Sequence, residues 1–165
     1  MPNHVYMNMH INGTDQEVAN FFEKHLDDDD HFDFETFKKM PDELRGTKAP
    51  CEPNPELVAK YGYDNWYDWH INNWGTKWNS YDNEIQDNVL SFQTAWSMPE
   101  PIFKMMAEMY PTMTFEVEVV EEGGYYAGRM FIAEGKVKED LSSDMNQWRA
   151  YAAEFLGWDF DADDE

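Results

Sequence analysis

Apolar and polar residues alternate along several stretches of the chain, and this alternation predicts strands. The segment "VYMNMHI" (5–11) places its apolar side chains on one face, as in a half-buried strand. "TMTFEVEVVEE" (112–122) alternates in the same way, and the "GG" that follows is a hairpin signal before a returning strand, "YYAGRMFIA" (125–133). Two further strands are predicted over 76–82 and 88–96, with the turn-like "NEIQD" between them.

Apolar residues at helical spacing predict three amphipathic helices. The first covers residues 14–26 and opens with the spacing of a capping box. The second is predicted to begin with another capping box at Ser97 and to stop at Pro111. The third follows from apolar residues that step by four, three, four and three positions, namely Leu141, Met145, Trp148, Ala152 and Phe155. Gly157 is the expected stop of this last helix.

A polar, proline-bearing stretch interrupts this order after the first helix. Residues from about 35–75 indicate a helical insert, with short helices predicted over 55–62 and 64–75. Without the insert, the order is β-α-β-β-α-β, the ferredoxin-like plan, followed by an added C-terminal strand and helix. We therefore predict an α+β fold in which helices cover one face of an antiparallel sheet. The expected organisation is one domain over residues 1–157 and an acidic tail over 158–165.

Four of the seven tryptophans lie within the segment "NWYDWHINNWGTKWNSYD" (65–82). Aromatic platforms that stack nucleic-acid bases normally carry flanking lysines and arginines, because phosphates accompany the bases. Lys77 is the only such residue in this segment, and acidic residues surround it. The expected role of the four tryptophans, Trp66, Trp69, Trp74 and Trp78, is therefore structural, fastening the insert to the domain. A carbohydrate platform remains the open alternative.

Several segments carry a resemblance to a known family. In chain order they are "MPNHV", "MPDEL", "YGYDNWYDWHINNWGTKWNSYD", "FQTAWSMPEPIFKMMAEMYP" and "EEGGYYAG". Together they resemble the phage- and plasmid-borne proteins that carry a YubB-type ferredoxin-like domain, over residues 1 to about 128. The resemblance implies the ferredoxin-like fold with a helical insert, and an origin in a mobile genetic element. It implies no activity, and the last helix and the tail lie outside it.

The charge balance narrows the classes of function. Thirty-four acidic residues stand against twelve basic ones, which gives a formal net charge of −22. Such a surface repels nucleic acid and anionic membranes and attracts positively charged partners. No apolar run is long enough to span a membrane, and the single cysteine, Cys51, can form no internal disulfide. These features predict a cytoplasmic protein that binds neither membranes nor nucleic acid directly.

The sequence offers no strong catalytic motif. The acidic run "DDDDHFDFE" (27–35) has oxygen ligands for a hard cation, but it lacks the glycine turn and the distal glutamate of a calcium loop. The five histidines show no zinc spacing, and His10 is the one that we would test. Nucleotide-binding glycine motifs and the nucleophile elbow are also missing. We expect no metal, no cofactor and no enzymatic activity, with a metal-dependent hydrolase using residues 27–35 as an alternative.

Charge and resemblance together predict an inhibitor that imitates DNA. Its partner would be a positively charged host complex that handles nucleic acid, as in CRISPR or restriction defence. The expected acidic interface consists of Asp27, Asp28, Asp29, Asp30, Asp33, Glu35, Glu116, Glu118, Glu121, Glu122, Asp159, Asp161, Asp163 and Asp164. Tyr125, Tyr126 and Trp158 are its candidate aromatic anchors.

Three other interpretations of the same surface stay open. In the first, the protein is an adaptor that binds another basic host protein without imitating DNA. Alternatively, the charge serves solubility alone. The exposed sheet face is also open to use as a homodimer interface.

Overall fold

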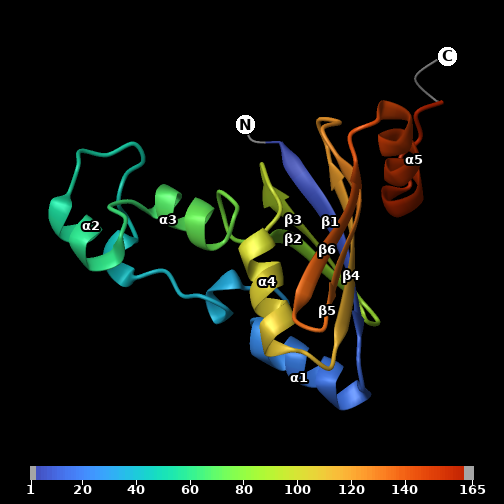
Figure 1. The fold of residues 1–165 in the computed structure, drawn as a ribbon, viewed down its shortest axis with the longest axis horizontal. Coiled ribbons are helices and arrows are strands. Elements are labelled where there is room, and N and C mark those ends of the chain that lie inside the picture. The colour runs from blue at the N-terminus through green and yellow to red at the C-terminus, as the bar shows by residue number, and fades with distance from the viewer. Residues whose placement is uncertain (1–2, 162–165) are drawn as a thin grey trace.

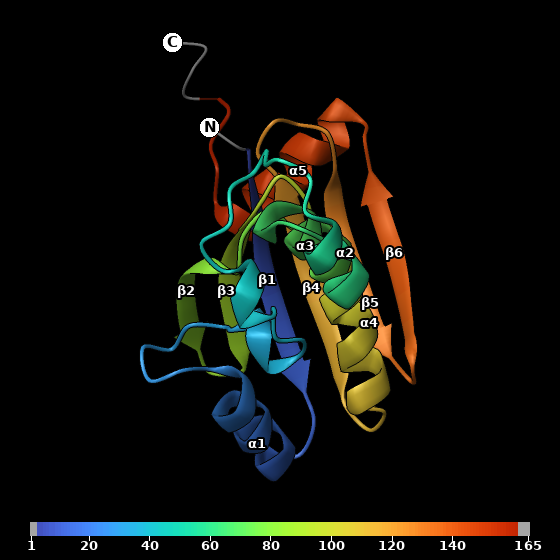
Figure 2. The same ribbon diagram turned by 90° about the vertical axis from the view of Figure 1, so that its left-hand side faces the viewer.

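The computed structural model describes residues 3–161, and its centre is one antiparallel sheet of six strands. The strands lie in the order β2-β3-β1-β4-β5-β6, which can be followed across Figure 2. Their bounds are β1 His4–Asn12, β2 Tyr81–Gln86, β3 Val89–Ala95, β4 Thr114–Glu121, β5 Ala127–Ala133 and β6 Lys136–Ser142. This arrangement confirms the predicted α+β fold with a ferredoxin-like antiparallel sheet.

Helices lie on both faces of the sheet (Figure 1). α1 (Asp15–His25) and α4 (Glu100–Met109) cover one face, as the ferredoxin-like plan predicts. The added C-terminal helix α5 (Met145–Leu156) packs on the opposite face, against β4 and β5. The sequence pattern leaves the face of this added helix unassigned.

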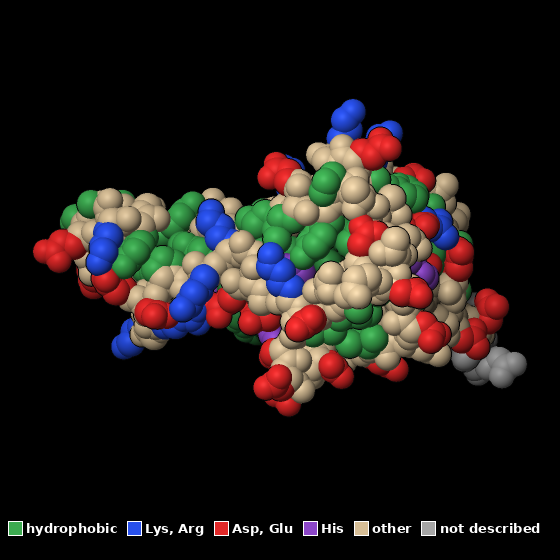
Figure 3. Space-filling model, turned by 90° about the horizontal axis from the view of Figure 1, so that it is seen from below, with side chains coloured by type: hydrophobic (Ala, Val, Ile, Leu, Met, Phe, Trp, Pro, Cys, Tyr) green, Lys and Arg blue, Asp and Glu red, His purple; other side chains and the backbone are tan. Residues whose placement is uncertain are grey.

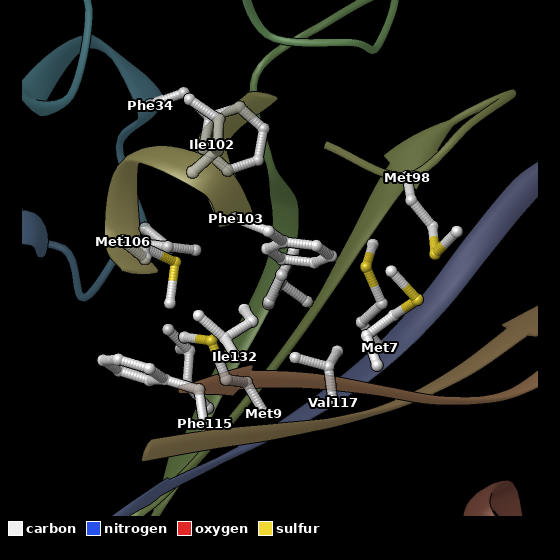
Figure 4. Close-up of a cluster of buried hydrophobic side chains, with 14 of the residues drawn as sticks. Met7, Met9, Phe34, Met98, Ile102, Phe103, Met106, Phe115, Val117 and Ile132 are labelled. Carbon is white, nitrogen blue, oxygen red and sulfur yellow. The ribbon is translucent and has the colours of Figure 1, made fainter. Parts of the chain in front are cut away.

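The main core lies between the sheet and the helices α1 and α4 (Figure 4). β1 contributes Met7 and Met9 from its inner face, and α4 contributes Phe103 and Met106. Met9 pairs with Val117 of β4, which is equally buried. Because side chains on one strand face point in one direction at every second position, the alternation in the sequence correctly identifies the core face of both strands.

A second, smaller core lies between α5 and the other face of the sheet. Val120 of β4 and Ala127 of β5 pack there with Trp148 and Ala152 of α5. The indole N–H of Trp148 also donates a 2.8 Å hydrogen bond to the backbone carbonyl of the last β4 residue. α5 ends as predicted at Gly157, which adopts the left-handed conformation at the C-cap.

The two edge strands differ from the prediction for one physical reason. β2 begins five residues later than the predicted strand 76–82, and β6 is missing from the prediction altogether. Edge strands pair on one side only and face solvent, so polar residues can occupy both of their faces and obscure the alternation. In β6, Val137 and Leu141 are the residues that pack against the core. Leu141 therefore belongs to β6, and its assignment to the last helix is wrong.

The insert forms an arm that projects from the sheet (Figure 1). We define the arm as residues 33–79. It contains the helices α2 (Pro55–Tyr61) and α3 (Trp66–Asn73) and two short 3-10 turns, η1 (Phe34–Thr36) and η2 (Asp42–Leu44). The predicted helical insert after the first helix is thus present.

Two of the four clustered tryptophans belong to the main buried core, which joins the base of the arm to the sheet domain. Trp69 and Trp74 are buried, and the indole N–H of Trp74 donates a 2.9 Å hydrogen bond to the carbonyl of Lys38. Their burial confirms the structural role predicted for them. Trp66 is half-buried, whereas the side chain of Trp78 is 40% exposed.

A hydrogen bond between side chain and backbone also ties the arm to the loop before α4. The Ser97 hydroxyl donates to the carbonyl of Gly75 at 2.5 Å. α4 begins only at Glu100, with Pro99 at its N-cap position and no side-chain cap. The capping box predicted at Ser97 is therefore wrong, because this hydroxyl is engaged with the arm.

The buried His25 gives the fold a testable pH dependence. Its ring stacks on Phe37 at 3.9 Å, Nδ1 lies 2.6 Å from the Thr36 hydroxyl oxygen, and Nε2 lies 2.5 Å from the Tyr110 hydroxyl. The Thr36 hydroxyl donates to the Asp33 carbonyl, so it accepts from Nδ1–H, and neutral Nε2 accepts from Tyr110. Burial, with a smaller contribution from the charge of Lys24, lowers the pKa of His25 to about 4.

We expect His25 to reduce the stability of the fold as the pH falls. The unfolded chain takes up this proton near pH 6.5, whereas the folded chain resists it down to about pH 4. The contribution therefore sets in below pH 6.5 and reaches on the order of 3 kcal/mol below pH 4. Urea unfolding of wild type and His25→Gln at pH 7, 5 and 4 measures it as the difference between the two pH profiles. Parallel profiles would contradict the prediction.

Candidate partner-binding surface

Charge is divided unevenly between the arm and the rest of the chain. The arm contains eight acidic and six basic residues, whereas the remainder contains 26 acidic and six basic residues. In Figure 3, side chains of both signs alternate on the projecting arm, and acidic side chains are spread over the body. The strongly negative surface therefore belongs to the sheet domain.

The acidic loop after α1 is a solvent-facing turn. One carboxylate oxygen of Asp27 accepts the backbone N–H groups of Asp29 and His31, at 2.9 and 3.0 Å, and these bonds with His31 and Asp29 lower the pKa of Asp27. Asp28, Asp29 and Asp30 are exposed. Among residues 3–161, no three His, Cys, Asp or Glu side chains lie close enough together to hold a metal ion.

Two predicted interface residues next to this loop serve the arm instead. Asp33 caps η1 by accepting the Glu35 N–H at 3.0 Å, and it accepts a 2.8 Å bond from the Asn79 side-chain amide. The Glu35 carboxylate forms an ion pair with Arg45. The carboxylates of Asp33 and Glu35 are therefore partly or wholly engaged in contacts within the protein.

The carboxylates on the outward sheet face are also engaged with neighbours. Glu116 lies 3.2 Å from the guanidinium of Arg129, and Glu118 lies 3.0 Å from Nε2 of His10. Asn8 donates a 3.3 Å bond to Glu118 and a 3.1 Å bond to the Phe155 carbonyl of α5. This part of the predicted interface is a polar network partly covered by α5.

Glu121 is not part of an exposed acidic surface, and this prediction is wrong. Its side chain lies at the end of β4 and the residue is only 2% exposed. The carboxylate accepts the backbone N–H groups of Gly123 and Tyr125, each at 3.0 Å. The alternation along β4 predicts this burial, because residues two positions apart point to the same face of a strand and Glu121 thus follows the buried Val117 and Val119. Its neighbour Glu122 accepts the His4 N–H at 2.7 Å.

The three predicted aromatic anchors occupy three different environments. Tyr125 is 72% exposed, as an anchor requires. Tyr126 is partly buried against the main core, and Trp158 packs on Tyr6 with ring centres 5.4 Å apart. Tyr126 and Trp158 are therefore less accessible than Tyr125, and their role as anchors stays a prediction.

The acidic tail is described only in its first part. Asp159 accepts the backbone N–H of Asp161 at 3.0 Å, and both lie beside Trp158. Asp163 and Asp164 lie outside the described residues.

Two exposed tryptophans lie close together: Trp78, whose exposure contradicts the structural role predicted for it, and Trp96, which the sequence analysis did not single out. The Lys77 ammonium lies 4.7 Å from the ring centre of Trp78 and 4.6 Å from that of Trp96, a double cation–π contact. Trp96 is 43% exposed and has a φ of 72°, which is rare for a bulky residue. Strained residues of this kind concentrate at binding sites. The segments "NWGTKWN" and "TAWSMP" thus meet where the arm joins the sheet.

A pocket of about 380 Å³ collects several of these features. Its walls are formed by Asn3, Trp96, Glu121, Tyr125 and Tyr126. It thereby combines one buried carboxylate with three aromatic rings, two of them largely exposed. The sequence named Glu121, Tyr125 and Tyr126 but gave no sign that Trp96 would join them.

A larger cavity of about 540 Å³ lies on the arm side of Trp96. It is lined by Ala49, Pro50, Cys51, Asp64, Asn65, Trp66, Tyr67, Asp68, Lys77 and Trp96. Desolvation and the neighbouring Asp64 carboxylate raise the pKa of the Cys51 thiol, which opposes formation of a nucleophilic thiolate. Asp64 itself accepts the Asn54 N–H at 3.1 Å and the Asn65 amide at 2.9 Å, so it holds the arm loop together.

The fold and this surface define the chain as an α+β protein of the ferredoxin-like class, with an aromatic and acidic pocket on the sheet domain whose residue Trp96 also contacts Lys77 of the arm. Residues 73–156 match the family described as "Ferredoxin-like domain in Api92-like protein", and the chain belongs to this family. The match runs from the end of α3 through α5. No curated protein and no solved structure matches the chain. Within residues 3–161, no helix has the length and apolar character needed to cross a membrane.

Proposed function

We propose that this protein is a non-enzymatic inhibitor from a phage or related mobile element, which binds a positively charged, nucleic-acid-handling host complex in place of DNA. The resemblance to YubB-type proteins supports the mobile-element origin. A defence complex of the CRISPR or restriction type is the concrete version of the partner. The proposed site of action is the cytoplasm of the host cell, where such complexes meet foreign DNA.

The observation that carries this proposal is the concentration of negative charge outside the arm. Twenty-six acidic against six basic residues leave a surplus of twenty carboxylates in that part of the chain. Duplex DNA carries one negative charge per roughly 1.7 Å of its axis, so a compact body of this charge resembles a short duplex segment. A groove that neutralises phosphates would attract it rapidly and with strong dependence on salt.

Several of the exposed carboxylates lie along one edge of the sheet, beside β2. His31 Nε2 lies 2.7 Å from the Ser80 carbonyl, and Asn83 accepts the Phe32 N–H at 3.0 Å, so the acidic loop is held beside β2. We call the exposed carboxylates of this region the acidic edge, and they are Asp28, Asp29, Asp30, Asp82 and Glu84. None of the five belongs to an ion pair within residues 3–161. They are the proposed substitutes for phosphates.

The first test is capture of partners from host lysate by the tagged protein, at low and moderate salt, with and without duplex DNA. We expect a DNA-binding complex that is captured at low salt, weakened by salt and released by DNA. Capture that DNA does not affect would overturn the imitation of DNA and favour the adaptor. If no protein is captured, the negative charge serves solubility alone.

Neutralising the acidic edge is expected to weaken this capture. The variant carries Asp28→Asn, Asp29→Asn, Asp82→Asn and Glu84→Gln. Since an exposed ion pair contributes about 0.2–1 kcal/mol, four such pairs predict a loss of affinity of roughly four- to thousandfold. The matched control neutralises four exposed carboxylates elsewhere that also belong to no ion pair within residues 3–161, Glu52, Glu56, Glu134 and Glu139, and has the same net charge as the first variant. Binding assays with the captured complex compare the two, and equal losses would refute a localised interface.

A further inference from the structure

The pocket beside Trp96 contains a buried negative charge without a cationic partner. Glu121 is 2% exposed, and its hydrogen-bond donors are the two backbone N–H groups of the following turn. Within residues 3–161 it takes part in no ion pair. A carboxylate offers about four lone-pair sites, so these two bonds leave part of its capacity unused, and Glu121 is among the residues that line the pocket. A buried charge is normally compensated, which points to a missing cation.

The other walls of the pocket suit a flat cation. Trp96 and Tyr125, two exposed aromatic residues, line the pocket together with Glu121 and Tyr126. Aromatic faces attract cations through their negative potential, and more strongly where water is excluded. Trp96 is held in its strained backbone conformation with its N–H donating to the Asn3 carbonyl at 2.9 Å.

The electrostatic surroundings favour the same kind of ligand. No Lys, Arg or His is among the lining residues. Burial first, and then the charges of Glu121 and Glu100, raise the pKa of Tyr126, so its hydroxyl stays protonated and neutral. Lys77 approaches the Trp96 ring but lines the neighbouring cavity. The pocket is thus negative and unoccupied by any cation of the described chain.

We propose that this pocket binds the guanidinium group of an arginine side chain supplied by the basic partner. Guanidinium is planar, stacks on aromatic rings and presents a fork of N–H donors to a carboxylate, whereas ammonium is a compact, strongly hydrated charge. The cavity of about 380 Å³ leaves room for such a side chain. The identity of the donor as a protein partner rests on the proposed function. The binding of a guanidinium group by the pocket does not rest on the proposed function.

A peptide titration tests the pocket without partner or DNA. The probes are acetyl-Gly-Arg-Gly-amide, its citrulline analogue of nearly equal shape and no charge, and its lysine analogue. The signals are the Trp96 indole N–H and the backbone N–H groups of Gly123 and Tyr125 in ¹H–¹⁵N NMR spectra. We expect saturable shifts with the arginine peptide and at least tenfold weaker binding of the other two. Equal binding of the citrulline or lysine peptide, or no saturable shift, overturns the proposal.

Substitutions locate the effect within the pocket. Tyr125→Ala changes an exposed side chain and should leave the fold intact, and Glu121→Gln removes the buried charge. Each is expected to weaken arginine binding at least tenfold, while Glu122→Gln, with the same charge change outside the pocket, should retain it. Retained binding in Tyr125→Ala would contradict the site even if Glu121→Gln proves unstable.

The two proposals fail in different ways. Arginine binding together with partner capture that ignores DNA would overturn the imitation of DNA and leave the pocket standing. Capture that DNA releases, without any arginine binding, would overturn the pocket alone.

Discussion

Trp74→Ala is expected to lower the free energy of unfolding by about 3–5 kcal/mol, the usual cost of truncating a buried aromatic residue. Trp74 is 2% exposed at the end of α3. Its ring stacks on His70 at 4.3 Å and meets Trp69 at 5.3 Å and Phe34 at 6.0 Å. Its indole also donates to the Lys38 carbonyl. The substitution leaves a large cavity and an unpaired carbonyl at the point where the arm joins the sheet domain.

Urea unfolding followed by circular dichroism measures this loss, and Trp78→Ala is the matched control. Trp78 lies four residues further along but is 40% exposed, so its removal is expected to cost less than about 1 kcal/mol. Limited proteolysis should also show faster cleavage within the arm of Trp74→Ala. Equal losses in the two variants would mean that the arm is not fastened through Trp74.

The sequence predicts the central strands well, because each is paired on both sides and has one buried face, which requires apolar residues at every second position. β1 is hydrogen-bonded to β3 and β4, and one of its faces is buried under α1 and α4, so its apolar residues fall at every second position. β2 and β6 lack a partner on one side. Side chains on both faces of β2 and β6 can be exposed to solvent, so the alternation of apolar and polar residues that predicts β1 is lost in these two strands.

The charges of the candidate interface are visible in the sequence, but their partners are not. Glu35 and Glu116 look as free as Asp28 until the fold brings Arg45 and Arg129 beside them. These contacts join different segments or neighbouring strands, which residue spacing alone does not specify. The total charge is therefore a robust prediction, whereas the choice of interface residues needed the structure.

The pocket at Trp96 shows the same limit in another form. Extending the β4 alternation by two residues places Glu121 on the buried face, so part of this site was within reach of the sequence. Trp96 was not, because its left-handed backbone and its contact with Lys77 depend on how the arm meets β3. Such sites are formed by junctions between segments, and a pattern within one segment carries no information about them.

Gly128→Ala is expected to destabilise the protein by about 3–5 kcal/mol, since a strained backbone and overpacking each cost roughly 1–3 kcal/mol. Gly128 lies in β5 with a φ of 152°. An added Cβ would lie 2.1 Å from the carbonyl oxygen of Asp140 and 2.9 Å from the Cα of Leu141, both in β6. These are backbone atoms in a paired strand, so they cannot move aside as a flexible side chain would.

The consequence of this clash should reach beyond the β5–β6 pair, because α5 packs on β5. Thermal unfolding is the measurement, and a loss of this size corresponds to a fall of roughly 6–20 °C in Tm for a chain of this length. Gly135→Ala is the control, since Gly135 also has a positive φ, 75°, but an added Cβ there meets nothing within 4 Å. The control should cost only the left-handed strain of about 1–2 kcal/mol. If Gly128→Ala were no worse than Gly135→Ala, β6 would have to be held loosely enough to move away from β5.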